Sequence, residues 1–425
     1  MRPPRLWSFR RPSLFYGWAI VGVGILVAFS SGPGQSFTFA VFIDSMIEDT
    51  GLSRSTLSGI YTLSTGLSAL MVALISRRAD RLGPRQLLLL VTLAFAGACF
   101  GLSVAAGIGA FLICFAALRG LGQASLPINA TLLVNQWFVR RRGRAIAIMG
   151  LGFPLSNAIL PPVSQALVDG IGWRSTFAIL GAMVLILVLP ATLLIVRNTP
   201  ESMGLHPDGA STPPASELER PRAEGPDRRR VLTSPAFWAL ALPMATPGLV
   251  ITAVVFHQFS IFEERGLSAG LSAASFSIFA VGSITVSMLS GWVLDRAGPY
   301  RVAIVGMGAL LVMLLLAQVI DSVILVVAYA LVTGTAAGTT RIVSGTVWAH
   351  RYGRHGLGRV QGSAMMVGVS GAALGPLPLA LMRDATGSYS LGIAVLMVLP
   401  VLAILALIRV SRAASRSEAP ASAGY

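Results

Sequence analysis

The sequence predicts an all-α membrane protein in which twelve membrane-spanning helices form two pseudo-symmetric six-helix bundles, with both termini in the cytoplasm. Three observations carry this prediction: the composition, the rhythm of the apolar runs and two short landmarks that recur at one spacing. The chain of 425 residues is 54% hydrophobic and only 12% charged, and its mean hydropathy is +0.75. Soluble proteins carry about a quarter charged residues, so lipid must cover most of this surface.

Twelve apolar runs are long enough to span the hydrocarbon core of a bilayer, which takes about 20 helical residues. Because no water is available there to bond to the backbone, each run is expected to be a helix. The first six lie at about 15–43, 56–76, 86–107, 109–136, 145–168 and 174–197. The second six lie at about 236–262, 271–294, 301–320, 323–349, 358–382 and 388–410.

Two landmarks occur once in each half of the chain. The polar turn 76–85 follows the second apolar run, and a similar turn at 291–300 follows the eighth, 215 positions later. The same offset carries the Gly-Leu-Ser sequence at 51–53 onto 266–268. Two landmarks at one spacing predict an internal duplication, with each half a copy of one ancestral unit.

The arginines predict the orientation in the membrane. All 32 basic residues are Arg, and 26 of them fall in segments that would lie on one side of the bilayer. The loops of the opposite side hold only Arg54, Arg174, Arg265 and Arg383. Since cytoplasmic loops are enriched in Arg and Lys, the arginine-rich side is expected to be cytoplasmic. The net charge of +15 is then explained without a nucleic-acid partner.

Residues 198–234 interrupt the apolar rhythm with Pro, Glu, Ser, Ala and Arg, and most of this segment is expected to be a mobile linker. The predicted organisation is therefore a first bundle over 1–197, the linker, a second bundle over 235–412 and a cytoplasmic tail over 413–425.

Several other functional classes lack support in the sequence. Cys99 and Cys114 both lie in apolar runs and are interpreted as small core residues rather than a disulfide or metal pair. A Walker-type phosphate loop is missing from the sequence, so ATP-driven transport is not expected. A membrane-embedded enzyme would need a nucleophile, a metal cluster or a paired acid and base at one depth. None occurs, so we expect no enzymatic activity, no cofactor and no metal.

The twelve runs and the two Asp-Arg-x-Gly-Pro turns resemble the major facilitator superfamily of secondary transporters. This resemblance implies two six-helix bundles that rock about a central cavity. Six further stretches resemble the monocarboxylate and oxalate/formate branch of this superfamily: 15–18, 51–55, 137–143, 172–174, 200–205 and 234–238. The sequence departs from that branch at 271–294, which holds no charged side chain, and Ser76 stands where the first turn usually has Gly.

Two arginines fall inside predicted spans. Arg119 lies about ten residues into the run 109–136, near the midplane at 1.5 Å per residue, and Arg341 lies toward the cytoplasmic side of 323–349. An embedded Arg costs at least about 2.5–3.5 kcal/mol on insertion scales, so each needs a wet cavity or a partner. Both are candidates for binding an anionic substrate through the guanidinium fork.

A structural interpretation stands beside each of these two assignments. Arg119 could bond to backbone carbonyls or to Gln123, one turn away. Gly334, Gly338 and Gly345 share the helical face of Arg341 and could leave room beside its guanidinium. Alternatively, these glycines pack helices closely while Arg341 reaches the inner membrane interface.

Four amides and one histidine complete the candidates at membrane depth. Asn129, Asn157 and Gln123 could contact substrate or join helices. Gln35 follows a Ser-Ser-Gly-Pro-Gly break in the first span and is expected to line the outer vestibule. His257 is a candidate for proton coupling, because imidazole titrates near neutral pH. The alternative for His257 is an interfacial side chain bonded to a neighbour.

The two polar turns are candidates for a cytoplasmic gate. Asp80 and Asp295 stand just before a span, where a carboxylate can meet a helix N-terminus and nearby arginines. Arg81, Arg85 and Arg296 are the arginines beside them, and simple topological anchoring is the alternative for these three. The glycines that precede two prolines, at 150 and 152 and at 371 and 375, are expected to permit bending and close packing in both halves.

We therefore expect a secondary active transporter that moves a small organic anion, a monocarboxylate or related carboxylate, by alternating access across the inner membrane of a bacterium. A proton gradient or a counter-anion gradient would supply the energy. The main alternative is an exporter of a neutral or amphiphilic compound. The expected partners are the organic anion, the lipid bilayer and protons, but no nucleic acid, and a monomer is expected.

Overall fold

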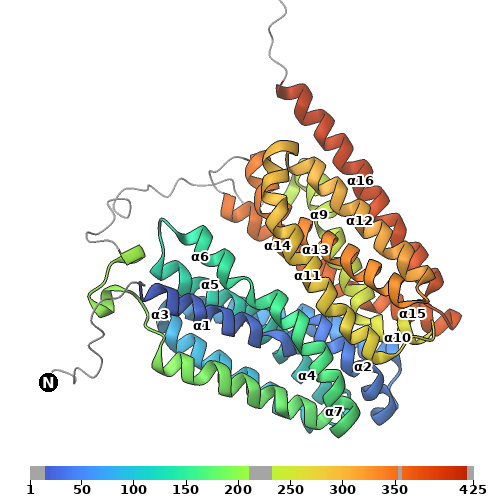
Figure 1. Ribbon diagram of the computed structural model, residues 1–425, viewed down its shortest axis with the longest axis horizontal. Helices are drawn as coiled ribbons and strands as arrows, with labels where there is room; N and C mark the ends of the chain where they lie inside the picture. Colours follow the sequence, from blue (N-terminus) through green and yellow to red (C-terminus); the bar gives the residue numbers. More distant parts are fainter. Residues whose placement is uncertain (1–14, 210–231, 353–356, 419–425) are drawn as a thin grey trace, which may run out of the picture.

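The helices form two bundles that lie side by side (Figure 1). The computed structural model describes residues 15–209, 232–352 and 357–418, and every regular element in these ranges is helical. One buried core extends from Ile20 to Val196 in the first bundle and continues into the second bundle through residues between Val255 and Phe276, and another core extends from Phe237 to Leu407 within the second bundle. The predicted all-α architecture in two halves is therefore confirmed.

The first bundle contains α1 (Gly17–Ser30), η1 (Gly32–Gly34), α2 (Ser36–Thr50), α3 (Arg54–Ser103), α4 (Gly107–Leu118), η2 (Arg119–Ser125), α5 (Leu126–Trp137), α6 (Arg142–Met149) and α7 (Gly152–Leu194). Two short turns, η3 (Glu201–Met203) and η4 (Pro207–Gly209), follow it. The second bundle contains α9 (Pro235–Phe256), α10 (Gln258–Glu263), α11 (Ala269–Ala297), α12 (Pro299–Val319), α13 (Val323–Tyr352), α14 (Leu357–Leu374), α15 (Pro376–Thr386) and α16 (Ser390–Glu418).

Ten helical segments of the described chain are long and apolar enough to cross a membrane. One of them, Arg142–Leu194, is 53 residues long and is divided at Gly172, where φ is 79° and ψ is 164°. It therefore covers two of the predicted spans. The part of α3 that precedes Gly83 corresponds to the predicted span 56–76. The first span is interrupted at η1, where the Ser-Ser-Gly-Pro-Gly sequence predicts a break.

The duplicated landmarks have the same backbone geometry in both halves. Gly83 has φ 73° and ψ 158°, and Gly298 has φ 74° and ψ 161°, a region that only glycine adopts readily. Ser53 and Ser268 also match, since each hydroxyl oxygen accepts a backbone N–H in the first turn of its helix, at 3.1 and 3.2 Å. The sequence repeat is thus a structural repeat.

Glycines allow two interrupted helices to approach their neighbours closely, as expected. A Cβ atom on Gly152, at the start of α7, would overlap the carbonyl oxygen of Ile25 on α1. A Cβ atom on Gly375, between α14 and α15, would overlap the carbonyl oxygen of Leu249 on α9. Each half therefore brings an interrupted helix against its own first span.

The two bundles converge at one end, which we call the closed end, and diverge toward the other (Figure 1). The closed end is where α2, α10 and α15 meet. Direct bonds join the halves there: the hydroxyl of Thr62 donates to the carbonyl of Ala373 at 2.9 Å, and the backbone N–H of Ser55 donates to the carboxylate of Asp384 at 3.2 Å. The diverging end carries Arg85 and the Arg-rich turn between α5 and α6, and we call it the arginine-rich end.

The chain after α7 is fixed to the first bundle as far as Gly209. The carboxylate of Asp208 accepts the backbone N–H groups of Val139, Arg140 and Arg141 at 3.0, 2.7 and 3.1 Å. Partial burial raises the pKa of this carboxyl. The three bonds and the charge of Arg141 together lower the pKa by more than burial raises it, so the pKa lies below its usual range. These bonds join the described chain after residue 197 to the first bundle, whereas residues 210–231 of the predicted linker lie outside the described residues. The predicted mobility of the linker stays a prediction.

Candidate functional site

Arg341 lies between the two halves, toward the arginine-rich end. Its side chain extends from α13 in the second half and is exposed, although the predicted span around it is apolar. The guanidinium carbon lies 5.3 Å from the ring centre of Phe153, on α7 in the first half. A cation within about 6 Å of an aromatic face is held by the ring quadrupole. Arg341 is therefore a positive charge, accessible to solvent, at the junction of the halves.

Aromatic rings continue from Phe153 across the junction. The ring of Phe37 on α2 meets Phe153 edge to face at 5.7 Å and lies 6.5 Å from Phe276 on α11 in the second half. Phe276 in turn stacks on Phe259 of α10 at 6.4 Å. Phe37, Phe276 and Phe259 are buried, so the half-buried ring of Phe153 is the part of this cluster that contacts Arg341.

A pocket of about 480 Å³ lies next to Arg341 along the same helix. Arg341 and Ser344, at positions i and i+3 of α13, are neighbours on one helical face. The pocket is formed by α9, α13 and α14 and combines polar with polarisable side chains. Its lining includes Met244, Thr340, Ser344, Trp348, Gln361 and Met365.

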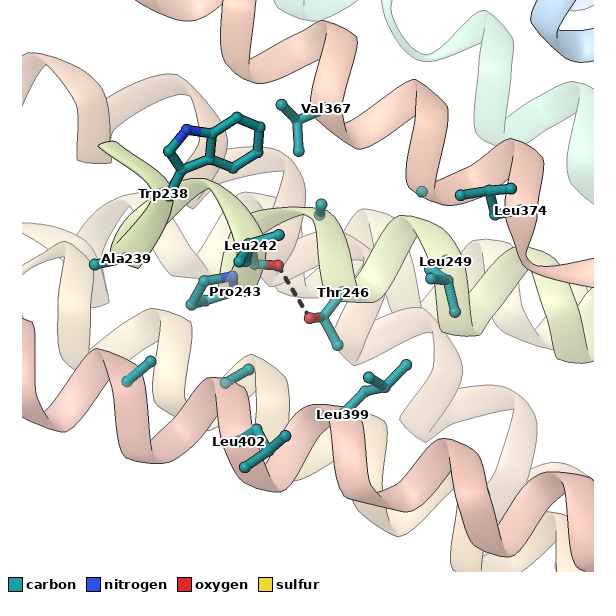
Figure 2. Close-up of a pocket in the computed structure, with 14 residues that line it drawn as sticks. Trp238, Ala239, Leu242, Pro243, Thr246, Leu249, Val367, Leu374, Leu399 and Leu402 are labelled. Atoms are coloured by element: carbon teal, nitrogen blue, oxygen red, sulfur yellow. Dashed lines mark hydrogen bonds between the residues drawn. The ribbon is translucent and has the colours of Figure 1, made fainter. Parts of the chain in front are cut away.

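A second cavity, also about 480 Å³, lies between α9, α14 and α16 (Figure 2). Leu242, Leu399 and Leu402 point into it, and the hydroxyl of Thr246 donates back to the carbonyl of Leu242 at 3.1 Å (Figure 2). No charged side chain lines it within the described part of the chain. This cavity suits hydrocarbon rather than a charged ligand, and we do not assign it to the site.

Arg119 is placed differently from Arg341, because its side chain is 0% exposed. The Nη1 group donates to the carbonyl of Gly34 at 2.8 Å, Nε donates to the hydroxyl of Thr65 at 3.1 Å, and the guanidinium lies 4.6 Å from the ring centre of Tyr61. The Gly34 carbonyl lies at the break in the first span, where the helical hydrogen-bond ladder is interrupted. Arg119 therefore bonds to a backbone carbonyl, as its structural interpretation requires, while its Nη2 atom is buried without a partner among the described residues. Its contact with substrate stays a prediction.

The four predicted amides are buried or half-buried. Asn129 donates to the carbonyl of Ser125 at 2.9 Å, and Gln35 donates to the hydroxyl of Ser31 at 3.4 Å. The Oδ1 atoms of Asn129 and Asn157 are buried without a hydrogen-bond partner among the described residues. Gln123 is half-buried and is not the partner of Arg119.

His257 is bonded within the second half and is 1% exposed. Its Nε2 atom lies 2.9 Å from the carbonyl oxygen of Pro376, and its Nδ1 atom lies 3.4 Å from the hydroxyl of Tyr389. The bonds to neighbours match the alternative interpretation, although the side chain is buried rather than exposed at an interface. Its place in proton coupling stays a prediction.

The structure describes the side chains of only two of the five predicted gate residues, Arg85 and Arg296. The side chains of Asp80, Arg81 and Asp295 lie outside the described ones, and Arg296 is exposed. Arg85 bonds within the first half: its side chain donates to the carbonyls of Thr192 and Leu193 at 3.4 and 2.7 Å. In this conformation Arg85 therefore anchors two helices of one bundle, and the gate stays a prediction.

Two glycines of the predicted stripe beside Arg341 serve helix packing. A Cβ atom on Gly334 would overlap the carbonyl oxygen of Phe279, and one on Gly338 would lie 2.9 Å from the carbonyl oxygen of Ser283. Both acceptors are on α11, so the stripe brings α13 against α11. The expected room beside the guanidinium comes instead from the divergence of the two halves. The surroundings of Gly345, the third glycine of the stripe, lie outside what the structure describes.

Sequence reasoning missed Phe153 and the pocket beside Arg341. The pocket left one signal, since Thr340, Ser344 and Trp348 recur every four residues on the helix that carries Arg341. No signal in the sequence pointed to Phe153, because its contact with Arg341 joins residues 188 positions apart and depends on how the two halves pack.

Comparisons with known proteins agree with this architecture. The model of the Major Facilitator Superfamily matches residues 24–376, with a second match at 244–423. An MFS-type transporter of Gibberella moniliformis is 28% identical over 381 residues, covering 88% of this chain and 85% of that protein. A gallate transporter of Pseudomonas putida is 28% identical over 356 residues, covering 76% of each chain.

Among solved structures, a bacterial homolog of the human lysosomal transporter Spinster, in an inward-facing and unoccupied conformation, superposes with a TM-score of 0.72. Its sequence is 17% identical, and the match covers 94% of this chain and 98% of that one. At this identity the likeness concerns the fold alone.

Proposed function

Because this chain belongs to the Major Facilitator Superfamily and is a multi-pass membrane transporter rather than an enzyme, we propose that it moves a small organic anion, a monocarboxylate or related carboxylate, by alternating access. The observation that carries the proposal is Arg341, an exposed residue of the second half whose guanidinium lies against Phe153 of the first half. Arg presents planar, paired N–H donors that match the two oxygens of a carboxylate. The similarity to a gallate transporter supports a carboxylate cargo.

The ring of Phe153 beside Arg341 suits an anion with an apolar body. Phe153 faces the guanidinium and is half-buried, and the buried ring of Phe37 supports it from behind. A carboxylate bound at Arg341 would place its apolar part against Phe153. The Coulomb attraction would also be stronger here than in bulk water, because protein surrounds the passage.

The closed end supplies the other element of alternating access. The hydroxyl of Ser277 donates to the carbonyl of Ala158 at 2.6 Å, and the rings of Tyr61 and Phe256 lie 4.5 Å apart, each pair joining the two halves. In the proposed cycle these contacts part while the arginine-rich end closes, so that Arg341 meets one side of the membrane at a time. By the bias of arginines toward cytoplasmic loops, the arginine-rich end faces the cytoplasm of a bacterial cell.

The energy source in this proposal is a proton or counter-anion gradient. Exchange for another anion would leave Arg341 paired with an anion in both directions, whereas a proton that enters with the carboxylate would balance the charge of the cargo.

The experiment is uptake of labelled benzoate, 4-hydroxybenzoate and lactate into liposomes that contain the purified protein or an Arg341 variant. Removing one partner of a charged hydrogen-bonded pair costs about 2–5 kcal/mol, so Arg341→Gln should weaken uptake of the accepted anion at least about tenfold. Uptake by Arg341→Lys should lie between that of the unaltered protein and that of Arg341→Gln, since lysine keeps the charge but loses the paired donors. Arg144→Gln, on the exposed arginine-rich end, removes the same charge and is the control. Unchanged uptake of every transported compound by Arg341→Gln would reject the anion and leave a neutral or amphiphilic cargo.

A further inference from the structure

The pocket between α9, α13 and α14 has a chemical character of its own, which the binding of a carboxylate does not require. We propose that it receives an uncharged aromatic ring bearing a hydroxyl or N–H donor, so that the preferred cargo is a hydroxylated aromatic acid. This inference rests on the proposed function, because Arg341 would hold the carboxylate of the same molecule.

The pocket and Arg341 lie on one face of α13. Thr340, Ser344 and Trp348 follow one another at every fourth position, and Arg341 precedes Trp348 by seven, so all four side chains fall on adjacent rows of the helix. At 1.5 Å per residue, Ser344 lies about 4.5 Å and Trp348 about 10.5 Å beyond Arg341 along the axis. A ligand with a charge at one end and a ring at the other can occupy both places.

The pocket walls fit a flat, polarisable ring. Met244 on α9 and Met365 on α14 belong to the lining together with the indole of Trp348. Thioether sulfur makes favourable contacts with aromatic rings, and its flexible chain adapts to their edges. The volume of about 480 Å³ falls within the range of small-molecule sites, and it exceeds what a two- or three-carbon acid would fill.

The hydroxyl of Thr340 determines which polar group suits the ring. It already donates its proton to the carbonyl of Ala336 at 2.7 Å. A hydroxyl has one donor and two acceptor positions, so Thr340 can only accept from a ligand in this rotamer. A phenolic O–H or a ring N–H meets that requirement, whereas an ether or carbonyl oxygen does not.

The first experiment uses the unaltered protein, and measures equilibrium binding of 4-hydroxybenzoate, benzoate and acetate to the purified transporter. We expect this order of affinity, with 4-hydroxybenzoate about threefold to tenfold tighter than benzoate, as one neutral hydrogen bond provides. Thr340→Val removes the acceptor at nearly constant volume, and should abolish this ratio while leaving benzoate binding unchanged.

A second variant fills the pocket without disturbing the backbone. A Cβ atom on Gly368, which lines the pocket on α14, meets no neighbouring atom within 4 Å, so Gly368→Leu can project into the space. It should weaken binding of both aromatic acids at least about tenfold and leave acetate unaffected. Gly362→Leu, on the same helix, exposed and equally unobstructed, is the matched control.

The outcomes separate this inference from the proposed function. If acetate binds as tightly as the aromatic acids, or Gly368→Leu leaves the aromatic acids unaffected, the pocket assignment is overturned while the anion site stands. If the three probes bind and Arg341→Gln weakens none of them, the carboxylate site fails instead. If none of the probes binds to the folded protein, the preference for aromatic acids is wrong.

Discussion

The decisive perturbation for Arg119 is Arg119→Lys. Both side chains are cations, so the energetic penalty of burying a charge is present before and after the exchange. What changes is the geometry: Arg119 donates to the Gly34 carbonyl and the Thr65 hydroxyl from two different nitrogens, while lying over the ring of Tyr61. A lysine carries its donors on one point charge and cannot reproduce this fork.

The expected loss of stability depends on which hydrogen bonds Gly34 and Thr65 keep when Arg119 is replaced. The Thr65 hydroxyl has another bond, since it donates to the carbonyl of Tyr61 at 2.8 Å. The Gly34 carbonyl is buried at the break in the first span, so it depends on the bond from Arg119. Losing one hydrogen bond to a charged group costs about 1.5–3 kcal/mol, and we expect Arg119→Lys to lower the free energy of unfolding by this amount.

The assay is denaturant unfolding in detergent, combined with the KM for uptake of the accepted anion. A residue that holds the broken span should lower stability and maximal rate while the KM stays within about twofold. Arg144→Lys, on the exposed arginine-rich end, is the control and should change neither quantity. Unaltered stability together with a KM raised tenfold or more would refute this reasoning and make Arg119 a substrate-binding residue.

Two further predictions concern the ends of the bundles. At the closed end, Asp384→Asn removes the negative charge from the N-terminus of α3, where Asp384 accepts the N–H of Ser55. Helix-terminal charges contribute about 0.3–1 kcal/mol, so spin-label distances across this end should show the parted state about two- to fivefold more populated. An unchanged distribution would show that this contact does not hold the closed end together. At the arginine-rich end, Asp208 fixes the segment after α7 to the first bundle, and its pKa is lowered in the folded protein. The stability that its carboxylate contributes is therefore complete above the ordinary carboxyl pKa of about 4, and it is lost as the pH falls through the lowered pKa of the folded state. Asp208→Asn should therefore speed amide exchange at Arg140 about tenfold or more at neutral pH, whereas equal exchange in both proteins would show that these bonds do not hold the segment.

Much of the fold was predictable because it depends on local chemistry. Gly83 and Gly298 adopt positive φ angles that other residues rarely tolerate, and each is followed by a proline that starts the next span. Ser53 and Ser268 cap helices through their own hydroxyls. Such features need only neighbours in the sequence, so the repeat could be read before the structure was known.

The candidate site was predictable only in part, because helix faces in a membrane carry little signal. Arg119 and Arg341 look alike in the sequence, each an isolated cation in an apolar span. A helix that is apolar on all sides shows no amphipathic stripe that would say which residues meet the passage and which meet another helix. The packing of η1 against η2 buries Arg119, and the divergence of the halves leaves Arg341 exposed.

The sequence by itself determined the helical spans, their duplication and the glycine turns, since backbone hydrogen bonding in lipid and positive φ angles act over a few residues. Only the tertiary structure decided that Arg119 bonds to the Gly34 carbonyl, that Arg341 faces Phe153, and that a pocket lies on the helix that carries Arg341. The physical reason is that these properties belong to contacts between distant helices, and their distances are set by how whole bundles pack.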